Sequence, residues 1–252
     1  MERLERLLGL SYIGIFTLFF FLFSSTQPAK TCSLKRYKWI GDTLVFDDNC
    51  YSFKSFAQKH KSLVFVGDSL SRRLAYTLAS LLMGETSTLD LARDPTGSHR
   101  QFNQIYNSNV SFFWAPCITT GLEFFQKNKD KYSLFIFSQG IHYLAPSGQC
   151  VNSNFFEDYD RFQRYHAKYK DKLIYRSQPM SSRVSLQAQL LEFIEFTRNK
   201  TTTRYLDHYE LLKERSYGKH RIVGNSFDHF GTQARLALAI HTFEYLKENL
   251  LF

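Results

Sequence analysis

No internal repeat and no low-complexity tract occurs in the 252 residues, and charged residues make up an ordinary 22% of them. Tyr and Phe are abundant instead, with 15 and 25 copies, so most of the chain is expected to be globular rather than disordered. The four cysteines include no CxxC pair, which argues against a zinc site. The length suits one α/β domain that follows an N-terminal appendage.

A basic run is also missing, although the formal net charge is +9. The nearest clusters are scattered over residues 127–131 and 168–172, and charge that is spread in this way usually marks a solvated face. The positive balance nevertheless favours acidic partners, such as anionic glycans or a membrane surface.

Long apolar runs are scarce, and residues 7–23 form the only charge-free one, with 17 residues. This length is at the short limit for a membrane span, which needs about 17–25 residues. Because the run exceeds the usual apolar core of a signal peptide, we expect an uncleaved signal anchor; the small residues Ser24, Ser25 and Thr26 keep cleavage as the alternative. The rest of the chain is then lumenal, in a single-pass type II protein of the Golgi or endoplasmic reticulum membrane, or is secreted after cleavage.

Two further features fit a lumenal domain. Glycosylation sequons occur at Asn109 and Asn199. The cysteines form an even set that is compatible with two disulfides in three possible pairings, of which we expect the local one, Cys32 with Cys50 and Cys117 with Cys150. Nucleic acid is disfavoured as a partner, because a lumenal chain rarely meets it.

We divide the chain into a cytosolic tip with the signal anchor (1–24), a linker with an irregular N-terminal subdomain (25–60) and the main domain (61–252). In the main domain, strand-like apolar runs alternate with segments of helical periodicity, which implies a parallel sheet with helices on both faces. The expected strands are residues 63–66, 110–114, 134–137, 173–175 and 204–206, and the expected helices are residues 70–83, 155–169, 186–196 and 233–246.

The motif Gly67-Asp68-Ser69 joins the first expected strand to the first expected helix. It places Ser69 at the carboxyl edge of the sheet and at a helix N-terminus, where free N–H groups and the helix dipole favour negative charge. A serine in that setting acts as a nucleophile when a base is near. The alternative is that Ser69 only caps the helix. Sites gather at the carboxyl ends of parallel strands, where the turns at Gly140 and Arg176 are also expected.

His229 is the candidate base. It stands beside Asp228 in the loop before the last expected helix, and a loop histidine next to an acid suits a general base. The same arrangement is also typical of structural or merely exposed histidines. A further acid upstream, Asp207, is interpreted as a structural residue at a strand end.

Several segments follow one another in an order that resembles a known family. They are the stretch from Cys32 through Trp39 to Cys50, the Gly67-Asp68-Ser69 turn, and residues 110–116, 138–142, 174–179 and 228–229. Together they resemble the PC-esterase family of the SGNH (GDSL-like) hydrolase superfamily, especially the plant trichome birefringence-like O-acetyltransferases.

The resemblance implies a three-layer α/β/α, SGNH-hydrolase-like fold with a mostly parallel sheet. It implies that Ser69 attacks an acyl carbonyl, that His229 accepts the proton, and that the Ser69 backbone N–H stabilises the oxyanion. The residues that it assigns to the oxyanion site and pocket are Asp68, Ser138, Gly140, His142 and Arg176. For His142 a core or surface position is an equal alternative, and for Arg176 a cap or salt-bridge role.

Two positions depart from the family pattern. Ser226 stands where the family has the acid of its catalytic pair, and the candidate catalytic acid is Asp228, adjacent to His229. Adjacent side chains point apart in extended backbone, so Asp228 orients the imidazole only if the loop bends sharply; otherwise a backbone carbonyl holds it. Ser138 stands where the family turn has Asn, and losing one oxyanion donor costs about 10²–10³ in rate. A catalytically impaired protein is therefore an alternative.

The predicted function is a serine-dependent O-acyl, most simply O-acetyl, transferase or esterase that acts on glycan hydroxyls in the secretory lumen. It needs no cofactor beyond an acyl donor such as an acetyl carrier. With at most one membrane span, the chain requires a donor already in the lumen or a membrane partner that supplies acyl groups. The alternatives are a glycan-binding or scaffold module on a decayed hydrolase fold and a secreted lipase-like esterase.

Overall fold

The structure of the protein is a computed structural model, which describes residues 37–40, 43–46, 62–83, 103–105, 110–145, 148–179, 184–201, 204–213 and 232–249. All described elements belong to one compact unit, Tyr37–Phe252. The expected signal anchor, Cys32 with Cys50, Asn109, Asp228 and His229 lie outside the described residues, so the predictions for them stay predictions.

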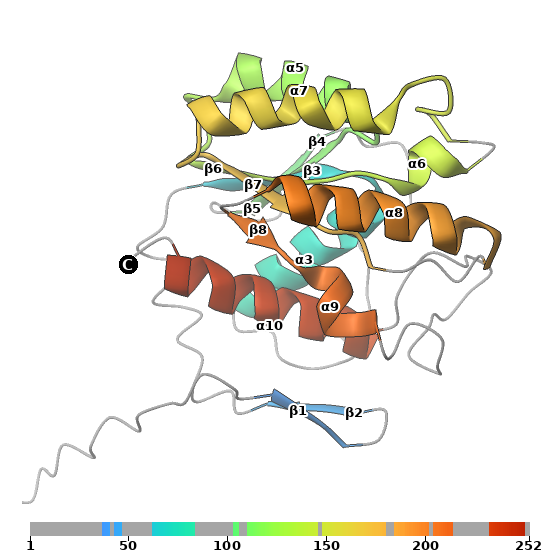
Figure 1. The fold of residues 1–252 in the computed structure, drawn as a ribbon. Helices are drawn as coiled ribbons and strands as arrows, with labels where there is room; N and C mark the ends of the chain where they lie inside the picture. The colour runs from blue at the N-terminus through green and yellow to red at the C-terminus, as the bar shows by residue number, and fades with distance from the viewer. Residues whose placement is uncertain are drawn as a thin grey trace, which may run out of the picture. The chain divides into compact units, whose positions relative to one another are not determined.

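A six-stranded sheet forms the centre of this unit, in the order β4-β5-β3-β6-β7-β8 (Figure 1). Five neighbouring strands run parallel, and β4 is antiparallel at the edge. The predicted α/β class and all five expected strands are therefore confirmed. The strands are β3 (Leu63–Gly67), β4 (Asn103–Ile105), β5 (Val110–Trp114), β6 (Leu134–Ser138), β7 (Leu173–Arg176) and β8 (Tyr205–Leu206).

A second sheet contains two antiparallel strands, β1 (Tyr37–Ile40) and β2 (Thr43–Phe46). They pair across a short connection, with Tyr37 opposite Phe46. The sequence predicted no regular element in this segment, because the apolar positions there show no long period.

Helices cover both faces of the large sheet. Figure 1 shows α5 and α7 above one face and α3 and α10 below the other. The four expected helices are confirmed, whereas α5, α6 and α9 were not predicted. The helices are α3 (Ser69–Met83), α5 (Ile118–Asn128), α6 (Ile141–Leu144), α7 (Phe155–Lys168), α8 (Val184–Lys200), α9 (His208–Leu212) and α10 (Thr232–Asn249).

The central strand β3 is buried on both faces. Leu63 and Phe65 pack in the cluster that contains α3 and α10, and Val64 and Val66 pack in the cluster that contains α5 and α7. Successive side chains of a strand point to opposite faces, so a strand covered by helices on both sides must be apolar at every position. This requirement produces the continuous apolar run that predicts the strand.

Helix α5 is the largest element that the sequence did not reveal. It contains Thr119, Thr120 and Gly121, residue types that disfavour a helix interior. Gly121 is needed because a Cβ there would lie 2.7 Å from the ring of Phe137. The segment is therefore helical because it packs closely on the sheet, although its local sequence has low helix propensity.

The expected disulfide between Cys117 and Cys150 is present. It ties the residue before α5 to the loop that precedes α7. Within the ranges given above, the structure contains no helix that is both long and apolar enough to cross a membrane.

Candidate active site

The turn that carries Ser69 begins where β3 ends at Gly67. The buried carboxylate of Asp68 accepts hydrogen bonds from the backbone N–H groups of Leu70 (2.9 Å) and Ser71 (3.4 Å). Asp68 is therefore the N-cap of α3, the role that the sequence left open for Ser69. Ser69 is the first residue of the helix and is partly exposed.

Gly67 allows the turn to pack tightly against the neighbouring strand. A Cβ at this position would lie 2.4 Å from the carbonyl oxygen of Ser138 and 2.4 Å from Oγ of Ser71. Real Cβ atoms do not approach a backbone oxygen so closely, so a side chain here would push β3 and β6 apart. The glycine of the motif thus allows the turn that carries Ser69 to pack closely against β6.

Gln178 connects the Ser69 turn to the turn after β6. Its Nε2 donates to Oδ2 of Asp68 at 2.6 Å, and its Oε1 accepts from the backbone N–H of Ile141 at 2.9 Å. The side chain is buried, so both bonds are shielded from water. Gln178 therefore fixes the Ser69 turn and the Gly140 turn relative to each other. No role was predicted for Gln178, although it stands within residues 174–179, as a polar side chain soon after a buried strand.

Arg176, at the end of β7, lies beneath the turn and is only 1% exposed. Its two terminal nitrogens donate to Oγ of Ser71 (3.0 Å) and to Nδ1 of His208 (3.2 Å). Burial lowers the pKa of Arg176 to about 10, and the nearby carboxylate of Asp68 offsets part of this effect. The guanidinium thus stays charged at neutral pH and joins β7 to α3 and α9.

His208 continues this chain of hydrogen bonds to the last helix. Because its Nδ1 accepts from Arg176, its Nε2 carries the proton and donates to Oγ1 of Thr242 at 3.1 Å. Thr242 donates in turn to the carbonyl of Leu238 at 2.7 Å. Burial and the positive charge of Arg176 hold the pKa of His208 well below its usual value, so the ring is neutral. No sequence signal marked His208.

The end of β6 and the segment directly after it contain three of the predicted site residues, Ser138, Gly140 and His142. Ser138 is fully buried, and its hydroxyl has no hydrogen-bond partner in the described part of the chain. His142 is partly exposed, and its ring lies 5.6 Å from the ring of Trp114 in an edge-to-face arrangement. Trp114 pairs with Gly67 in the sheet register, so both rings stand next to the Ser69 turn. Gly140 lies between these two positions and is the residue directly before α6.

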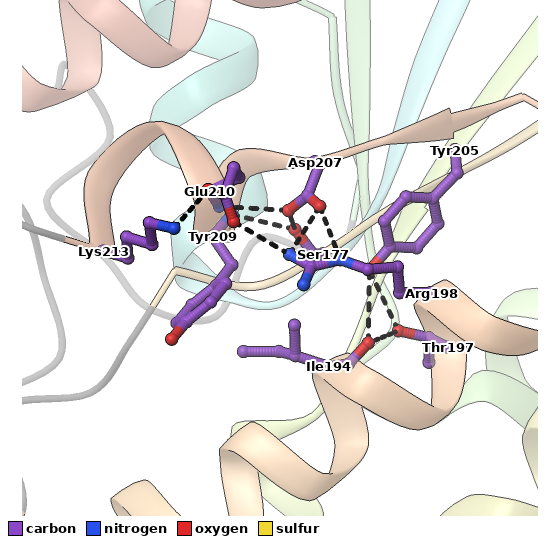
Figure 2. A network of polar contacts seen from close by, with 9 residues as sticks. All are labelled: Ser177, Ile194, Thr197, Arg198, Tyr205, Asp207, Tyr209, Glu210 and Lys213. Atoms are coloured by element: carbon purple, nitrogen blue, oxygen red, sulfur yellow. Dashed lines mark hydrogen bonds and ion pairs between the residues drawn. The ribbon is translucent and has the colours of Figure 1, made fainter.

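Asp207 has a structural role, as predicted. Figure 2 shows its carboxylate between Ser177 and Arg198. It accepts from Oγ of Ser177 and from the backbone N–H of Glu210, both at 3.1 Å, and pairs with Arg198 at 2.6 Å. Asp207 thus caps α9 and anchors the end of β8.

The carboxyl edge of the sheet brings together the predicted residues that the structure describes. Asp68 and Ser69 follow β3, Gly140 and His142 follow β6, and Arg176 ends β7, three strands that are adjacent and parallel. Within the ranges described, no group of His, Cys, Asp and Glu side chains is placed to hold a metal ion. The approach of His229 to Ser69 stays a prediction.

Comparison with known proteins places the fold. No protein-family model and no curated protein sequence matches the chain. Among solved structures, the lipase/acylhydrolase from Enterococcus faecalis matches with a TM-score of 0.53 at 13% identity, covering 75% of this chain and 96% of that chain. A catalytic mutant of an acetylxylan esterase from Geobacillus stearothermophilus matches with a TM-score of 0.49 at 10% identity, over 74% and 94% of the two chains. A GDSL-like lipase from Bacteroides thetaiotaomicron matches with a TM-score of 0.47 at 9% identity, over 78% and 98%. The first match supports the resemblance at the level of fold alone: the chain shares the α/β fold of that lipase/acylhydrolase.

Proposed function

We propose that the protein is a serine-dependent O-acyltransferase or O-acyl esterase that adds acyl groups, most simply acetyl groups, to glycan hydroxyls or removes them in the secretory lumen. The observation that carries the proposal is the position of Ser69. It is the first residue of α3, directly after the central parallel strand, in a turn that Asp68 caps and Gln178 holds. The acylhydrolase fold and the motif order of the PC-esterase family support the same chemistry.

In the proposed reaction, Oγ of Ser69 attacks the acyl carbonyl carbon while the imidazole of His229 takes its proton. The backbone N–H of Ser69, at the start of α3, donates to the oxyanion of the tetrahedral intermediate. The ester C–O bond then breaks, the leaving alcohol takes the proton from His229, and Ser69 carries the acyl group. Attack by water completes an esterase cycle, and attack by a sugar hydroxyl completes a transferase cycle.

The buried position of Ser138 favours a second candidate, a glycan-binding module without catalysis. The hydroxyl of Ser138 is fully buried, so it is a poor substitute for an exposed amide donor at the oxyanion. An active enzyme must then rely on backbone N–H groups, and one without enough donors would only bind its glycan.

A fluorophosphonate probe separates the two candidates, because it labels an activated serine. We expect labelling of the purified protein, loss of labelling in Ser69→Ala, and retention in the control Ser62→Ala, a serine that lies directly before β3 and not in the turn after it. Folded wild-type protein that stays unlabelled contradicts the enzyme and leaves the binding module, whereas equal labelling of Ser69→Ala removes Ser69 from the mechanism.

The mass of the acylated peptide that contains Ser69 gives the transferred group. We expect an added acetyl group after incubation with an acetylated reporter ester, and its transfer to a glycan acceptor or to water decides the direction of the reaction. N-terminal sequencing of the protein expressed in eukaryotic cells separates a retained signal anchor from a cleaved signal peptide. Asn199, exposed near the end of α8, is accessible for the predicted glycan.

A further inference from the structure

Two basic clusters that are separate in the sequence converge in the fold. Residues 127–131 form the end of α5 and the turn after it, and residues 168–172 form the end of α7 and the turn after it. The ammonium group of Lys172 donates to the backbone carbonyl of Lys129, which joins the two turns. The scattered charges that the sequence suggested as a solvated face thus form one surface.

A groove of about 450 Å³ lies on this surface, between α5 and α7. The side chain of Gln126 on α5 donates a hydrogen bond to Tyr165 on α7 across it. Among the residues that the structure describes, no acidic side chain lines the groove. Its walls are formed by three cations and three aromatic rings, namely Lys129, Arg164, Lys168, Phe125, Tyr165 and Tyr169.

The cations of the groove are concentrated around one ring. The Nζ atoms of Lys129 and Lys168 lie 5.8 and 5.4 Å from the ring centroid of Tyr169. The helix dipole accounts for Lys168, in the last turn of α7, because cations are favourable at helix C-termini. It does not account for the hollow shape or for Arg164, whose planar fork suits a carboxylate or a sulfate. An anion between these groups would relieve the repulsion among three like charges.

The groove lies away from the carboxyl edge that carries Ser69. The turns after α5 and α7 lead into the starts of β6 and β7, so the groove stands at the amino edge of the sheet. A ligand in it therefore contacts the protein without reaching the candidate nucleophile.

We propose that this groove binds an acidic oligosaccharide, with carboxylate or sulfate groups on Lys129, Arg164 and Lys168 and sugar rings against Tyr165 and Tyr169. The choice of a carbohydrate rests on the proposed function, whereas the preference for an anion rests on the groove alone. A membrane surface fits less well: the large apolar side chains that are exposed in the described residues are Met83 and Val151, neither of which lies in the groove. A second binding place would hold a long acidic glycan while another part of it reaches Ser69.

Direct titration of the full chain tests the proposal without using its activity. The probes are an oligogalacturonate, a neutral xylo-oligosaccharide of equal length, and vesicles that contain phosphatidylserine. We expect the wild-type protein to bind the oligogalacturonate, with an affinity that falls as salt rises, and to bind the neutral chain more weakly. The variant Lys129→Gln/Arg164→Gln/Lys168→Gln should bind at least about tenfold more weakly, because it loses three ion pairs.

The matched control removes three exposed cations outside the groove, Lys200→Gln/Lys213→Gln/Lys247→Gln, and should bind within about twofold of the wild type. Equal weakening in the control, unchanged binding in the groove variant, equal affinity for the neutral chain, or binding to vesicles alone overturns the proposal. The single variant Arg164→Glu, on the exposed face of α7, repeats the test if the triple variant unfolds. Absence of an acyl group on Ser69 would remove the proposed function and leave this binding result intact.

Discussion

Two polar networks at the carboxyl edge of the sheet both connect strand ends to the neighbouring helices, and they differ in their access to solvent. In the first, which we call the buried network, Asp68, Gln178, Arg176 and His208 join β3 and β7 to α3, α9 and α10. These four side chains are at most 3% exposed.

The second, the exposed network of Figure 2, joins the ends of β7 and β8 to α8 and α9 through Ser177, Asp207, Arg198 and Glu210. The side chains of Asp207 and Arg198 are 26% and 36% exposed. Water can replace a lost partner in this network but not in the buried one. The consequences of a substitution should therefore follow solvent access rather than the number of bonds.

The largest effect is expected at Arg176. Replacing Arg176 by Met removes the donors to Ser71 and His208 and leaves both acceptors buried. We expect the free energy of unfolding to fall by about 3 kcal/mol or more, as for other buried charged hydrogen bonds. Urea denaturation measures the change. Arg176→Lys keeps the charge but not the planar fork and should recover little of the stability. A loss below about 1 kcal/mol in Arg176→Met would show that this network does not stabilise the fold.

Gln178 is expected to come next, and the chain offers a matched comparison in Gln126. Gln178→Leu leaves a carboxylate oxygen of Asp68 and the N–H of Ile141 without their partner in a buried site, at a cost of about 2 kcal/mol. Gln126→Leu breaks the exposed bond to Tyr165 and should leave the urea midpoint unchanged. Fluorophosphonate labelling of Ser69 should slow in Gln178→Leu alone, because only that variant releases the Ser69 turn. Equal effects in the two variants would contradict the role of burial.

This difference also explains what the sequence revealed. The five parallel strands and four of the helices follow from apolar patterns, since a buried strand must be apolar at every position and a packed helix on one face. Helix α5 was not predicted because the close contact with the ring of Phe137 requires a glycine at position 121, and glycine has low helix propensity.

The residues of the candidate site also fall into two groups, those that the sequence predicted and those that it did not. Gly67, Asp68 and Ser69 were found because a short local motif carries them. Gln178 and His208 were missed because their partners, Asp68 and Thr242, lie 110 and 34 residues away, and nothing in the neighbouring sequence distinguishes them from ordinary loop residues. Long-range polar contacts become visible only when the topology has brought two strand ends together.

The stability of the fold should depend on pH, because the buried network contains a titratable group, His208. The pKa of His208 is lowered by burial and by Arg176, and burial also lowers the pKa values of His166 and His241. The unfolded chain therefore binds more protons below pH 6.5. The free energy of unfolding should reach its full value above that pH, fall as the pH drops below it, and stop falling once the pH is below the folded pKa values. Each histidine contributes a slope of at most about 1.4 kcal/mol per pH unit.

The variant His208→Gln isolates one of these contributions. Its amide oxygen can accept from Arg176 and its amide nitrogen can donate to Thr242, while the group no longer titrates. Urea denaturation between pH 7 and pH 5 should show a shallower decline than in the wild type. Parallel pH profiles would mean that His208 binds protons equally in the folded and the unfolded chain, so that folding does not lower its pKa.

Within the two networks, the smallest effect is expected at Arg198, which makes as many polar contacts as Arg176 but lies at the surface. Arg198 pairs with Asp207 at 2.6 Å and with Glu210 at 3.5 Å, and solvent screens both pairs. Arg198→Gln should lower the free energy of unfolding by less than about 1 kcal/mol, and high salt should reduce the difference further. Because Asp207 keeps its bonds to Ser177 and to the N–H of Glu210, the cap of α9 survives the substitution. A loss as large as that of Arg176→Met would mean that the number of bonds, and not their shielding from water, determines how strongly the strand ends are held.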